Sequence, residues 1–524
     1  MYEIQKYNYS KASLNEVKKY RFGENWPVVY ILEDGREAYI GEAGSAYRRA
    51  TQHLANLDRV KLKNFYIIAD DEYNKSATLD IESSLIRYMS GDGKFLLQNG
   101  NFGIQEADYY DKERYQAKFQ IIWEDLKKRN LVKNDLVQIE NSDLFKYSPY
   151  KALSVDQLSV VENILEILKS EEPSSFLITG EPGTGKTIVA TYLMKLLSSK
   201  KWSQGRRIGL VIPMTSLRKT LKRVFKSVKG LNPGMILGPN DVVKQNYDIL
   251  IVDEAHRLQR RINLPNYRDF DRINALLGLE KNGGTQLDWI MRSSKSQILF
   301  YDEHQSVKPA DIRPKNMEKY NFTKLKLTSQ MRVKGGEDYI KYIRDVLNQE
   351  QKEKHSFENY DFRIFENAKD MFDIIQEKNK KHGLSRLLAG YAWKWQTKGN
   401  ETVDYDIEID GVRLKWNSVT EDWVNSPNAV NEVGCIHTIQ GYDLNYAGVI
   451  IGPEIYYDEK TRKITVDKRK YLDFNGRRAI SDPRELDIYI KNIYKTLLTR
   501  GLYGTYVYAV DENLRKYLSK YIAR

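Results

Sequence analysis

Cysteine is almost absent from this chain, since Cys435 is the only one among 524 residues. A disulfide framework and a cysteine-based zinc cluster are therefore excluded, and such a composition is typical of the reducing cytoplasm. The N-terminus lacks the apolar core of a secretory signal peptide. No apolar run approaches the roughly 18 residues that span a bilayer. These absences predict a cytoplasmic protein that does not associate with a membrane.

Positive charge is in excess, with 83 Lys and Arg against 71 Asp and Glu and a formal net charge of +12. An excess of this sign indicates a polyanionic partner such as nucleic acid. Hydrophobic residues make up 41% and aromatic residues 12%, which is enough to build large cores. The length predicts about three or four domains.

One segment has the pattern G-x-x-x-x-G-K-[ST] between an apolar, strand-like stretch and a helical one. It consists of Gly180, Gly183, Gly185, Lys186 and Thr187 with the residues between them. Glycines at these positions let backbone N–H groups surround a triphosphate, the lysine reaches the outer phosphates, and the threonine hydroxyl holds Mg²⁺. The segment therefore predicts binding of ATP with Mg²⁺.

Two further strand-like segments end in polar side chains, at the edge of the sheet where ligands bind. Asp253 and Glu254 follow the apolar segment 249–252, and Gln305 follows segment 297–301 after a short turn. We expect Asp253 to hold the Mg²⁺ shell, Glu254 to act as general base, and Gln305 to touch the γ-phosphate. Upstream, Gln157 opens an amphipathic helix and either reads an adenine edge or lies on the surface beside a helix cap.

In order and character these segments resemble superfamily 1 helicases over roughly residues 151–524. The resemblance implies two tandem RecA-like domains, at 151–330 and 331–524. It also implies that Arg332 in a Gln-Met-Arg segment and Arg500 in a Thr-Arg-Gly segment reach the nucleotide, and that Gln440 in His-Thr-Ile-Gln-Gly couples nucleotide to strand. The Schlafen-like ATPase group is the part of the superfamily that this chain resembles most.

The first hundred residues show a second pattern. A hairpin is predicted around Asp34-Gly35, and Tyr39-Ile40-Gly41 is followed by an arginine and a histidine at helical spacing. The segment resembles the GIY-YIG nucleases, although Val28-Val29-Tyr30 keeps only the tyrosine of their first motif. The resemblance implies a catalytic set of Tyr30, Tyr39, Arg49, His53, Glu82 and either Asn99 or Asn101. Glu82 would hold Mg²⁺ or Mn²⁺ at the scissile phosphate.

Two weaker signals leave alternatives open. The basic helix predicted at 217–229 is either a solvated face or a track for a phosphate backbone. Four tryptophans, Trp393, Trp395, Trp416 and Trp423, either pack a β insertion near 391–430 or stack on bases, and packing is favoured.

The sequence thus predicts an α/β chain with a small GIY-YIG-like domain at 1–105, a helical linker at 106–150 and two RecA-like domains with parallel sheets. The expected function is an ATP-dependent nucleic-acid enzyme that joins an endonuclease to a helicase or translocase, by analogy in defence against foreign DNA. DNA is favoured over RNA as the partner, and oligomers are compatible with the sequence. Two alternatives are an ATP-gated RNA nuclease of Schlafen-like type and a nucleic-acid sensor with an inactive front domain.

Overall fold

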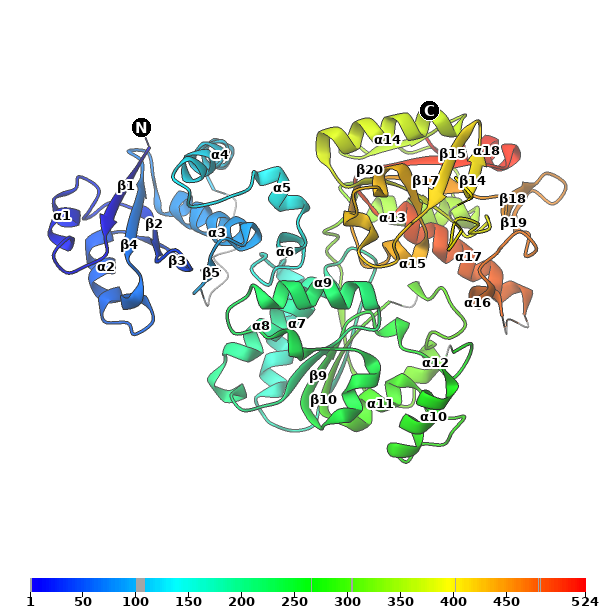
Figure 1. Ribbon diagram of the computed structural model, residues 1–524, viewed down its shortest axis with the longest axis horizontal. Coiled ribbons are helices and arrows are strands. Elements are labelled where there is room, and N and C mark those ends of the chain that lie inside the picture. Colours follow the sequence, from blue (N-terminus) through cyan, green and yellow to red (C-terminus); the bar gives the residue numbers. More distant parts are fainter. Residues whose placement is uncertain are drawn as a thin grey trace. The chain divides into compact units, whose positions relative to one another are not determined.

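The computed structural model describes residues 2–99, 109–264, 266–302, 305–400, 402–478, 480 and 482–524. The chain forms two compact units (Figure 1). The first comprises Met1–Leu158, Thr191–Gln204 and Leu221–Gly234, and the second comprises Ser159–Ala190, Gly205–Thr220 and Met235–Arg524.

The front of the first unit is a five-stranded sheet with the order β1-β4-β2-β3-β5. Its strands are β1 (Glu3–Asn8), β2 (Val28–Glu33), β3 (Glu37–Ala43), β4 (Asn64–Ala69) and β5 (Leu96–Leu97). β2 and β3 pair antiparallel, and the Asp34 carboxylate accepts hydrogen bonds from the backbone N–H groups of Arg36 and Glu37 at 2.9 and 2.7 Å. The predicted hairpin is therefore confirmed.

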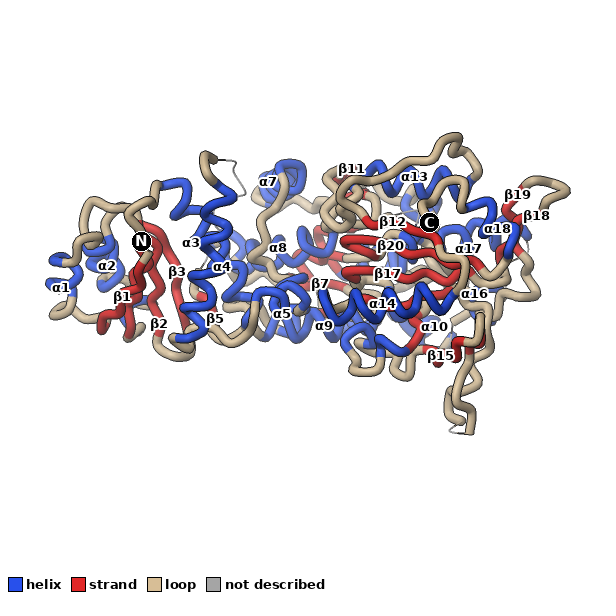
Figure 2. The backbone as a smooth tube through the Cα atoms, turned by 90° about the horizontal axis from the view of Figure 1, so that it is seen from above, coloured by secondary structure: helices blue, strands red, loops and turns tan. Residues whose placement is uncertain are grey.

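Helices cover both faces of this front sheet. The helices in this part of the chain are α1 (Leu14–Lys19), α2 (Ala46–Leu54), α3 (Lys75–Asp92), α4 (Lys112–Lys128), α5 (Leu136–Asn141) and α6 (Asp143–Lys146). Figures 1 and 2 show α1 and α2 on one face and α3 on the other. The segment 106–150, which the sequence predicts to be a helical linker, contains α4, α5 and α6. These helices pack on α3: the ring of Tyr88 lies 5.4, 5.8 and 4.9 Å from the ring centres of Phe119, Trp123 and Phe145.

The second unit contains a six-stranded parallel sheet with the order β11-β6-β10-β9-β7-β8. Its strands are β6 (Ser175–Gly180), β7 (Ile208–Val211), β8 (Ile236–Leu237), β9 (Tyr247–Val252), β10 (Ser294–Tyr301) and β11 (Thr323–Leu327). The helices in this part of the chain are α7 (Val155–Leu168), α8 (Lys186–Ser199), α9 (Thr215–Lys226), α10 (Tyr267–Leu276), α11 (Gln286–Ser293) and α12 (Pro314–Met317). Because β6, β10 and β9 are neighbours, their carboxyl ends meet at one edge.

A seven-stranded sheet follows, with the order β12-β20-β17-β13-β16-β15-β14. Its strands are β12 (Asp361–Ile364), β13 (Ser385–Ala389), β14 (Ile407–Ile409), β15 (Val412–Trp416), β16 (Glu432–Gly434), β17 (Leu444–Ile451) and β20 (Gly501–Ala509). Apart from the antiparallel β14–β15 hairpin at its edge, its strands run parallel.

Successive residues of β17 serve two different cores, since strand side chains alternate between the faces of a sheet. Val449 packs with residues of α13 (Gly336–Asn348) and α17 (Pro483–Leu498), while Ile450 packs with α14 (Ala368–His382). Figure 2 shows these helices on opposite sides of the strands. The remaining elements are the hairpin β18 (Ile455–Asp458) and β19 (Lys463–Val466), with α15 (Ile436–Ile439), α16 (Phe474–Arg477) and α18 (Glu512–Leu518).

The two sheets of the second unit confirm the predicted α/β class with two successive sheets of mainly parallel strands. The tryptophan-rich segment extends the second sheet by the β14–β15 hairpin, and Trp416 and Trp423 are buried in its cores, as the packing alternative predicts. Trp393 and Trp395 are half-buried. In the described part of the chain, no helix combines the length and the apolar character that crossing a membrane requires.

Candidate functional site

The predicted phosphate loop joins the end of β6 to the start of α8. Gly183 has φ +90° and Gly185 has φ +78°, a backbone region that favours glycine. A Cβ on Gly183 would also lie 2.0 Å from Gln330 Oε1, so the neighbouring chain leaves no room for a side chain. Position 183 therefore accepts only a glycine, because Gln330 and Arg332 occupy the space that a side chain would need.

Lys186 lies over the loop with its ammonium group among carbonyl oxygens. Its Nζ donates to the carbonyl oxygens of Gly180 and Glu181 at 2.6 and 3.0 Å, and it is 3.4 Å from Asp302 Oδ2. The side chain is only 6% exposed. A buried positive charge at the mouth of the loop is the group that an outer phosphate needs.

Thr187 and Asp253 come together as the sequence predicts for a magnesium site. The Thr187 hydroxyl donates to Asp253 Oδ2 at 2.7 Å, and Asp253 is fully buried. Its other oxygen, Oδ1, is buried without a hydrogen-bond partner among the described residues. Burial, and then the negative charge of Glu254, raise the pKa of Asp253 above its usual value. A buried carboxylate with one unsatisfied oxygen beside a hydroxyl fits a hydrated Mg²⁺ ion.

Glu254 has φ +52°, a strained backbone for a residue with a side chain, which turns it out of the line of β9. His256 Nε2 lies 2.9 Å from its carboxylate, and both side chains are buried. Burial opposes ionisation, but the nearby His256, Lys186 and Arg500 lower the pKa of Glu254 below its usual value. Glu254 is therefore ionised at neutral pH and able to accept a proton.

A chain of hydrogen bonds links β10 to Arg500, which directly precedes β20. Gln305 Nε2 donates to Asp302 Oδ2 at 2.6 Å, and Arg500 Nη2 donates to Gln305 Oε1 at 3.4 Å. Arg500 is 1% exposed and also donates to the carbonyl oxygen of Tyr442 at 3.3 Å. Arg500 thus brings a positive charge from the second sheet to the carboxylates of the first.

Arg332 comes from the segment that crosses the phosphate loop. The backbone N–H of Met331 donates to the carbonyl oxygen of Gly183 at 2.8 Å, and Gln330 Nε2 donates to the carbonyl oxygen of Pro182 at 2.7 Å. The guanidinium of Arg332 forms an ion pair with Asp443. Its backbone lies at the loop, and contact of its side chain with a nucleotide stays a prediction.

The two other predicted glutamines have different surroundings. Gln440 is 1% exposed, and neither its amide oxygen nor its amide nitrogen has a hydrogen-bond partner among the described residues. Gln157 is equally buried, and its Oε1 accepts a hydrogen bond from the backbone N–H of Ser154 at 3.0 Å, so it caps α7. It therefore does not lie on the surface, and a role toward adenine stays a prediction.

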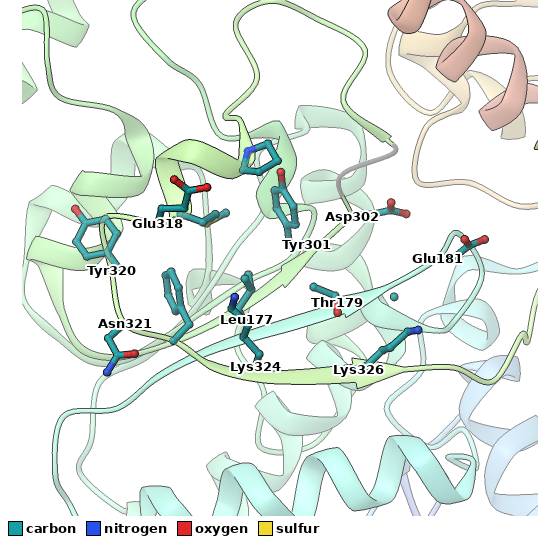
Figure 3. Close-up of a pocket in the computed structure, with 14 residues that line it drawn as sticks. Leu177, Thr179, Glu181, Tyr301, Asp302, Glu318, Tyr320, Asn321, Lys324 and Lys326 are labelled. Atoms are coloured by element: carbon teal, nitrogen blue, oxygen red, sulfur yellow. The ribbon is translucent and has the colours of Figure 1, made fainter. Parts of the chain in front are cut away.

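A cavity of about 670 Å³ adjoins the phosphate loop. Figure 3 shows Glu181 and Asp302 at its loop end, and Tyr320 and Asn321 at the opposite end. Lys324 and Lys326 of β11 lie along the same cavity. The cavity therefore lies at the carboxyl ends of β6 and β10 and along β11, beside the predicted triphosphate site.

The basic helix α9 has mixed surroundings. Lys219 forms an ion pair with Glu421, and Arg223 pairs with Asp143 at 3.1 Å. Arg218 is half-buried and donates to the carbonyl oxygen of Ile212 at 2.9 Å. Several of its charges thus have partners within the protein, and a phosphate track along this helix stays a prediction.

In the front domain, Tyr30 and His53 form the centre of a second cluster. Tyr30 Oη lies 2.7 Å from His53 Nε2, and Arg59 Nη1 donates to His53 Nδ1 at 2.7 Å. Burial, and then Arg59 and Arg49, lower the pKa of His53 to about 3, so the ring is neutral. Because a guanidinium only donates, the ring proton is on Nε2 and is donated to the Tyr30 oxygen.

Gly41 makes this arrangement sterically feasible. A Cβ at this position would lie 2.2 Å from Tyr30 Oη, so the tyrosine hydroxyl occupies the space above the glycine. The charge of Arg49 favours the ionised form of the Tyr30 hydroxyl and so acts against the effect of burial. Burial, and then Tyr39, raise the pKa of Tyr30 above its usual value. Tyr30 therefore keeps its proton at neutral pH and is suited to position a water molecule.

Tyr39 contacts this cluster directly, and Asn99 binds the backbone of the strand that carries Tyr39. The rings of Tyr39 and His53 are 5.1 Å apart in an edge-on arrangement, and the Arg59 guanidinium lies 3.8 Å from the centre of the Tyr39 ring. Asn99 accepts from the backbone N–H of Ile40 at 3.1 Å and donates to its carbonyl oxygen at 2.8 Å. Asn99 thus fixes β3. The alternative asparagine, Asn101, lies outside the described residues.

Glu82 of α3 faces the same cluster. Burial, and then the charge of Glu42, raise the pKa of Glu82 to about 7, whereas Arg49 acts in the opposite direction. Glu42 Oε2 is buried without a hydrogen-bond partner among the described residues, although its other oxygen pairs with Lys75. Two neighbouring carboxylates, one with an unsatisfied oxygen, fit a divalent cation. Within the described residues, no cluster of three or more His, Cys, Asp or Glu side chains suits a metal ion.

The sequence alone did not assign a role in these two sites to Glu42, Arg59, His256 or Gln330. Glu42 directly follows the Tyr-Ile-Gly motif, and His256 follows Asp253-Glu254 in the same run, so adjacency could have pointed to both. Arg59 begins a short 3-10 helix, Arg59–Lys61, six residues after His53, and its approach to the ring depends on the turn after α2.

Comparisons with known proteins agree with the ATPase half of this geometry. Residues 173–511 match the family described as Schlafen group 3, DNA/RNA helicase domain. An uncharacterised protein of Saccharomyces cerevisiae is 27% identical over 430 residues, which cover 70% of this chain and 90% of that protein. An ORC1-type DNA replication protein of Thermococcus kodakarensis is 25% identical over 172 residues, which cover 29% of this chain and 40% of that protein.

Solved structures of Pif1 helicases are also similar, at 12% identity. A Bacteroides Pif1 helicase in complex with ADP-AlF3 and ssDNA has a TM-score of 0.25, with 57% of this chain and 86% of that chain covered. The Pif1 helicase from Candida albicans has a TM-score of 0.28, with 71% and 98% covered. The family match covers more than half of the chain and includes the phosphate loop and Arg500. The chain therefore belongs to the Schlafen group 3 DNA/RNA helicase domain family.

Proposed function

We propose that the chain is an ATP-dependent nucleic-acid enzyme, with a superfamily 1 type ATPase behind a GIY-YIG-type endonuclease. The observation that carries the ATPase is the meeting of one buried set of groups at the edge shared by β6, β9 and β10. This set is Lys186, Thr187, Asp253, Glu254 and Arg500.

In this proposal the groups divide the hydrolysis of ATP between them. Lys186 binds the outer phosphates, and Thr187 and Asp253 would hold Mg²⁺, which neutralises phosphate charge when bound. Glu254 orients water and accepts its proton while the bond from the water oxygen to the γ-phosphorus forms and the bond to the bridging oxygen breaks. Arg500 stabilises the charge on the γ-phosphoryl oxygens in the transition state.

Glu254→Gln is expected to bind ATP but to hydrolyse it at least about 100-fold more slowly, because only the proton acceptor is lost. Lys186→Ala is expected to lose ATP binding as well, since the charge facing the phosphates is removed. Phosphate release and retention of labelled ATP distinguish the two results. Wild-type hydrolysis by Lys186→Ala would contradict the assignment of the loop.

Nucleic acid is the proposed partner of this ATPase, with DNA favoured and RNA as the alternative. The support is the net charge of +12 and membership of a helicase-domain family. The test is the rate of ATP hydrolysis with single- and double-stranded DNA and RNA in turn. An ATPase rate that no nucleic acid changes would favour a switch over a translocase.

A metal-dependent endonuclease is the proposed activity of the front domain. Its support is the gathering of His53, Arg49 and Glu82 around Tyr30. Glu82 and Glu42 would hold Mg²⁺ or Mn²⁺, which activates the scissile phosphate when bound. Tyr30 positions the water, which gives up a proton to solvent as its oxygen bonds to phosphorus. The ester bond breaks at the same time, and the leaving oxygen takes up a proton from solvent. Arg49 binds the phosphate. Defence against foreign DNA is the biological role that this combination suggests.

Tyr30→Phe is expected to cut at least about tenfold more slowly while ATP hydrolysis is unchanged, because the hydroxyl that orients water is lost. The ring remains, so the packing of the cluster is preserved. Tyr66→Phe is the matched control, since Tyr66 is also buried in the front sheet and lies on β4. Equal cutting by wild type and Tyr30→Phe would show that the hydroxyl only packs.

A further inference from the structure

A groove of about 430 Å³ lies on the second unit, on the segment between the hairpin β18–β19 and α17. Its lining contains four basic side chains, Lys468, Arg469, Arg477 and Arg478, together with Phe474 of α16. None of these residues belongs to the ATPase set described above. The groove therefore has a charge and composition that ATP hydrolysis does not explain.

The side chain of Phe474 is exposed to solvent. It is 60% exposed, and the guanidinium carbon of Arg478 is 5.7 Å from the centre of its ring. Burial of a phenylalanine side chain against a ligand is worth about 1.5–3 kcal/mol. Phe474 is the one phenylalanine among the described residues whose side chain is largely exposed. An aromatic ring flanked by cations suits an unpaired base with its phosphate.

The charges of the groove are largely available to a ligand. Lys468, Arg477 and Arg478 are exposed and form no ion pair with a described residue, whereas Arg469 pairs with Asp467 at 3.0 Å. Arg477 also donates to the carbonyl oxygen of Tyr471 at 3.3 Å, which holds the side chain beside the groove. Three cations around one exposed ring match the repeating phosphate and base of a single strand.

The groove is also connected to the His-Thr-Ile-Gln-Gly segment at residues 437–441, which contains Gln440. Asp473, which precedes Phe474, caps α16 by accepting from the backbone N–H of Gly476 at 2.9 Å. Its other carboxylate oxygen lies 2.8 Å from His437 Nε2, in the segment that contains Gln440. A ligand that moves α16 thus acts directly on a residue of the predicted nucleotide-coupling motif.

We propose that this groove binds single-stranded nucleic acid, with Phe474 stacking on a base and Lys468, Arg477 and Arg478 contacting phosphates. This proposal rests on the proposed function, because it assigns a contact site for the strand that the ATPase acts on. It concerns a segment outside the residues that handle ATP. A duplex is the less suitable ligand, since its bases are already stacked on one another.

The test measures binding of labelled single-stranded DNA and RNA, and of duplexes, by the full chain over a range of salt concentrations. Phe474→Ala is expected to weaken single-strand binding roughly 5- to 150-fold with an unchanged salt slope, since stacking carries no charge. Phe474→Trp should retain the affinity. Arg477→Gln with Arg478→Gln should reduce the slope of log K against log salt by about 1.4.

Lys380→Gln with Lys381→Gln removes the same charge from two exposed adjacent lysines at the end of α14 and is the control. Leu276→Ala, with a side chain that is 63% exposed on α10, is the control for Phe474. The melting temperature and the ATPase rate without nucleic acid verify that each variant folds.

Several results separate the groove from the proposed function. If the wild type binds single strands and the groove variants bind them equally well with the same slope, the groove assignment is wrong. An effect of the groove variants on duplexes alone would also overturn it. If the wild type binds no nucleic acid at all, the proposed function itself fails.

Discussion

Arg500→Ala is expected to slow ATP hydrolysis by about 10³- to 10⁵-fold, the range that an arginine in contact with a transferring phosphoryl group contributes. Arg500 is 1% exposed, its guanidinium donates to Gln305, and it lowers the pKa of Glu254. The guanidinium of Arg500 therefore lies close to Gln305 and Glu254, the residues expected to contact the γ-phosphate and the attacking water. ATP binding should persist, because Lys186 and the backbone of the loop are unchanged.

Arg500→Lys should recover little of the loss, since an ammonium group cannot make the two-pronged contact of a guanidinium. Arg363→Ala is the matched control, because Arg363 lies in the same sheet and pairs with Asp361 at 2.6 Å, away from this set. Single-turnover hydrolysis and binding of labelled ATP are the measurements. Turnover within tenfold of the wild type in Arg500→Ala would show that the residue is only structural.

Glu82→Gln is expected to abolish phosphodiester cleavage, with a loss of at least about 10³-fold, while ATP hydrolysis continues. An amide of the same size preserves packing but removes the charged oxygen that holds a divalent cation, and with it the Lewis acid at the phosphate. EDTA should have the same effect on the wild type, and Mg²⁺ or Mn²⁺ should restore cutting. Gel assays of labelled strands report both results.

Glu72→Gln serves as the control, because Glu72 is a front-domain carboxylate that pairs with Arg114 and Lys118. It should cut as the wild type does. A Glu82→Gln protein that cuts normally, or a wild type that cuts equally well in EDTA, would rule out the nuclease. The front domain would then be better explained as a module that grips nucleic acid, which needs only positive charge.

Much of the ATPase site was predictable because its residues are local in sequence. The run from Gly180 to Thr187 and the pair Asp253-Glu254 each follow a strand, and parallel strands bring their carboxyl ends to one edge. The structure places Thr187 and Asp253 in direct contact across 66 positions of sequence. By contrast, the pairing of Arg332 with Asp443 depends on how two segments meet, and no local pattern reports it.

In the front domain, too, some features of the site are predictable from the sequence and others depend on packing. The Tyr39-Ile40-Gly41 motif and the spacing to Arg49 and His53 predict one helix face beside one hairpin. The sequence does not show that Gly41 is required by the Tyr30 hydroxyl, nor that Glu42 faces Glu82, since both follow from packing of β2, β3 and α3. The exposed Phe474 is likewise one aromatic residue among many until its surroundings are known.

The sequence by itself determined the α/β class, the phosphate loop and the chain order of the motifs, because local spacing and hydrophobic periodicity encode them. Tertiary structure decided the protonation state of His53, the pKa of Glu82 and the approach of Arg500 to Gln305. These properties depend on burial and on charges brought together from distant positions, and Coulomb interactions are set by distance in space and not by distance along the chain.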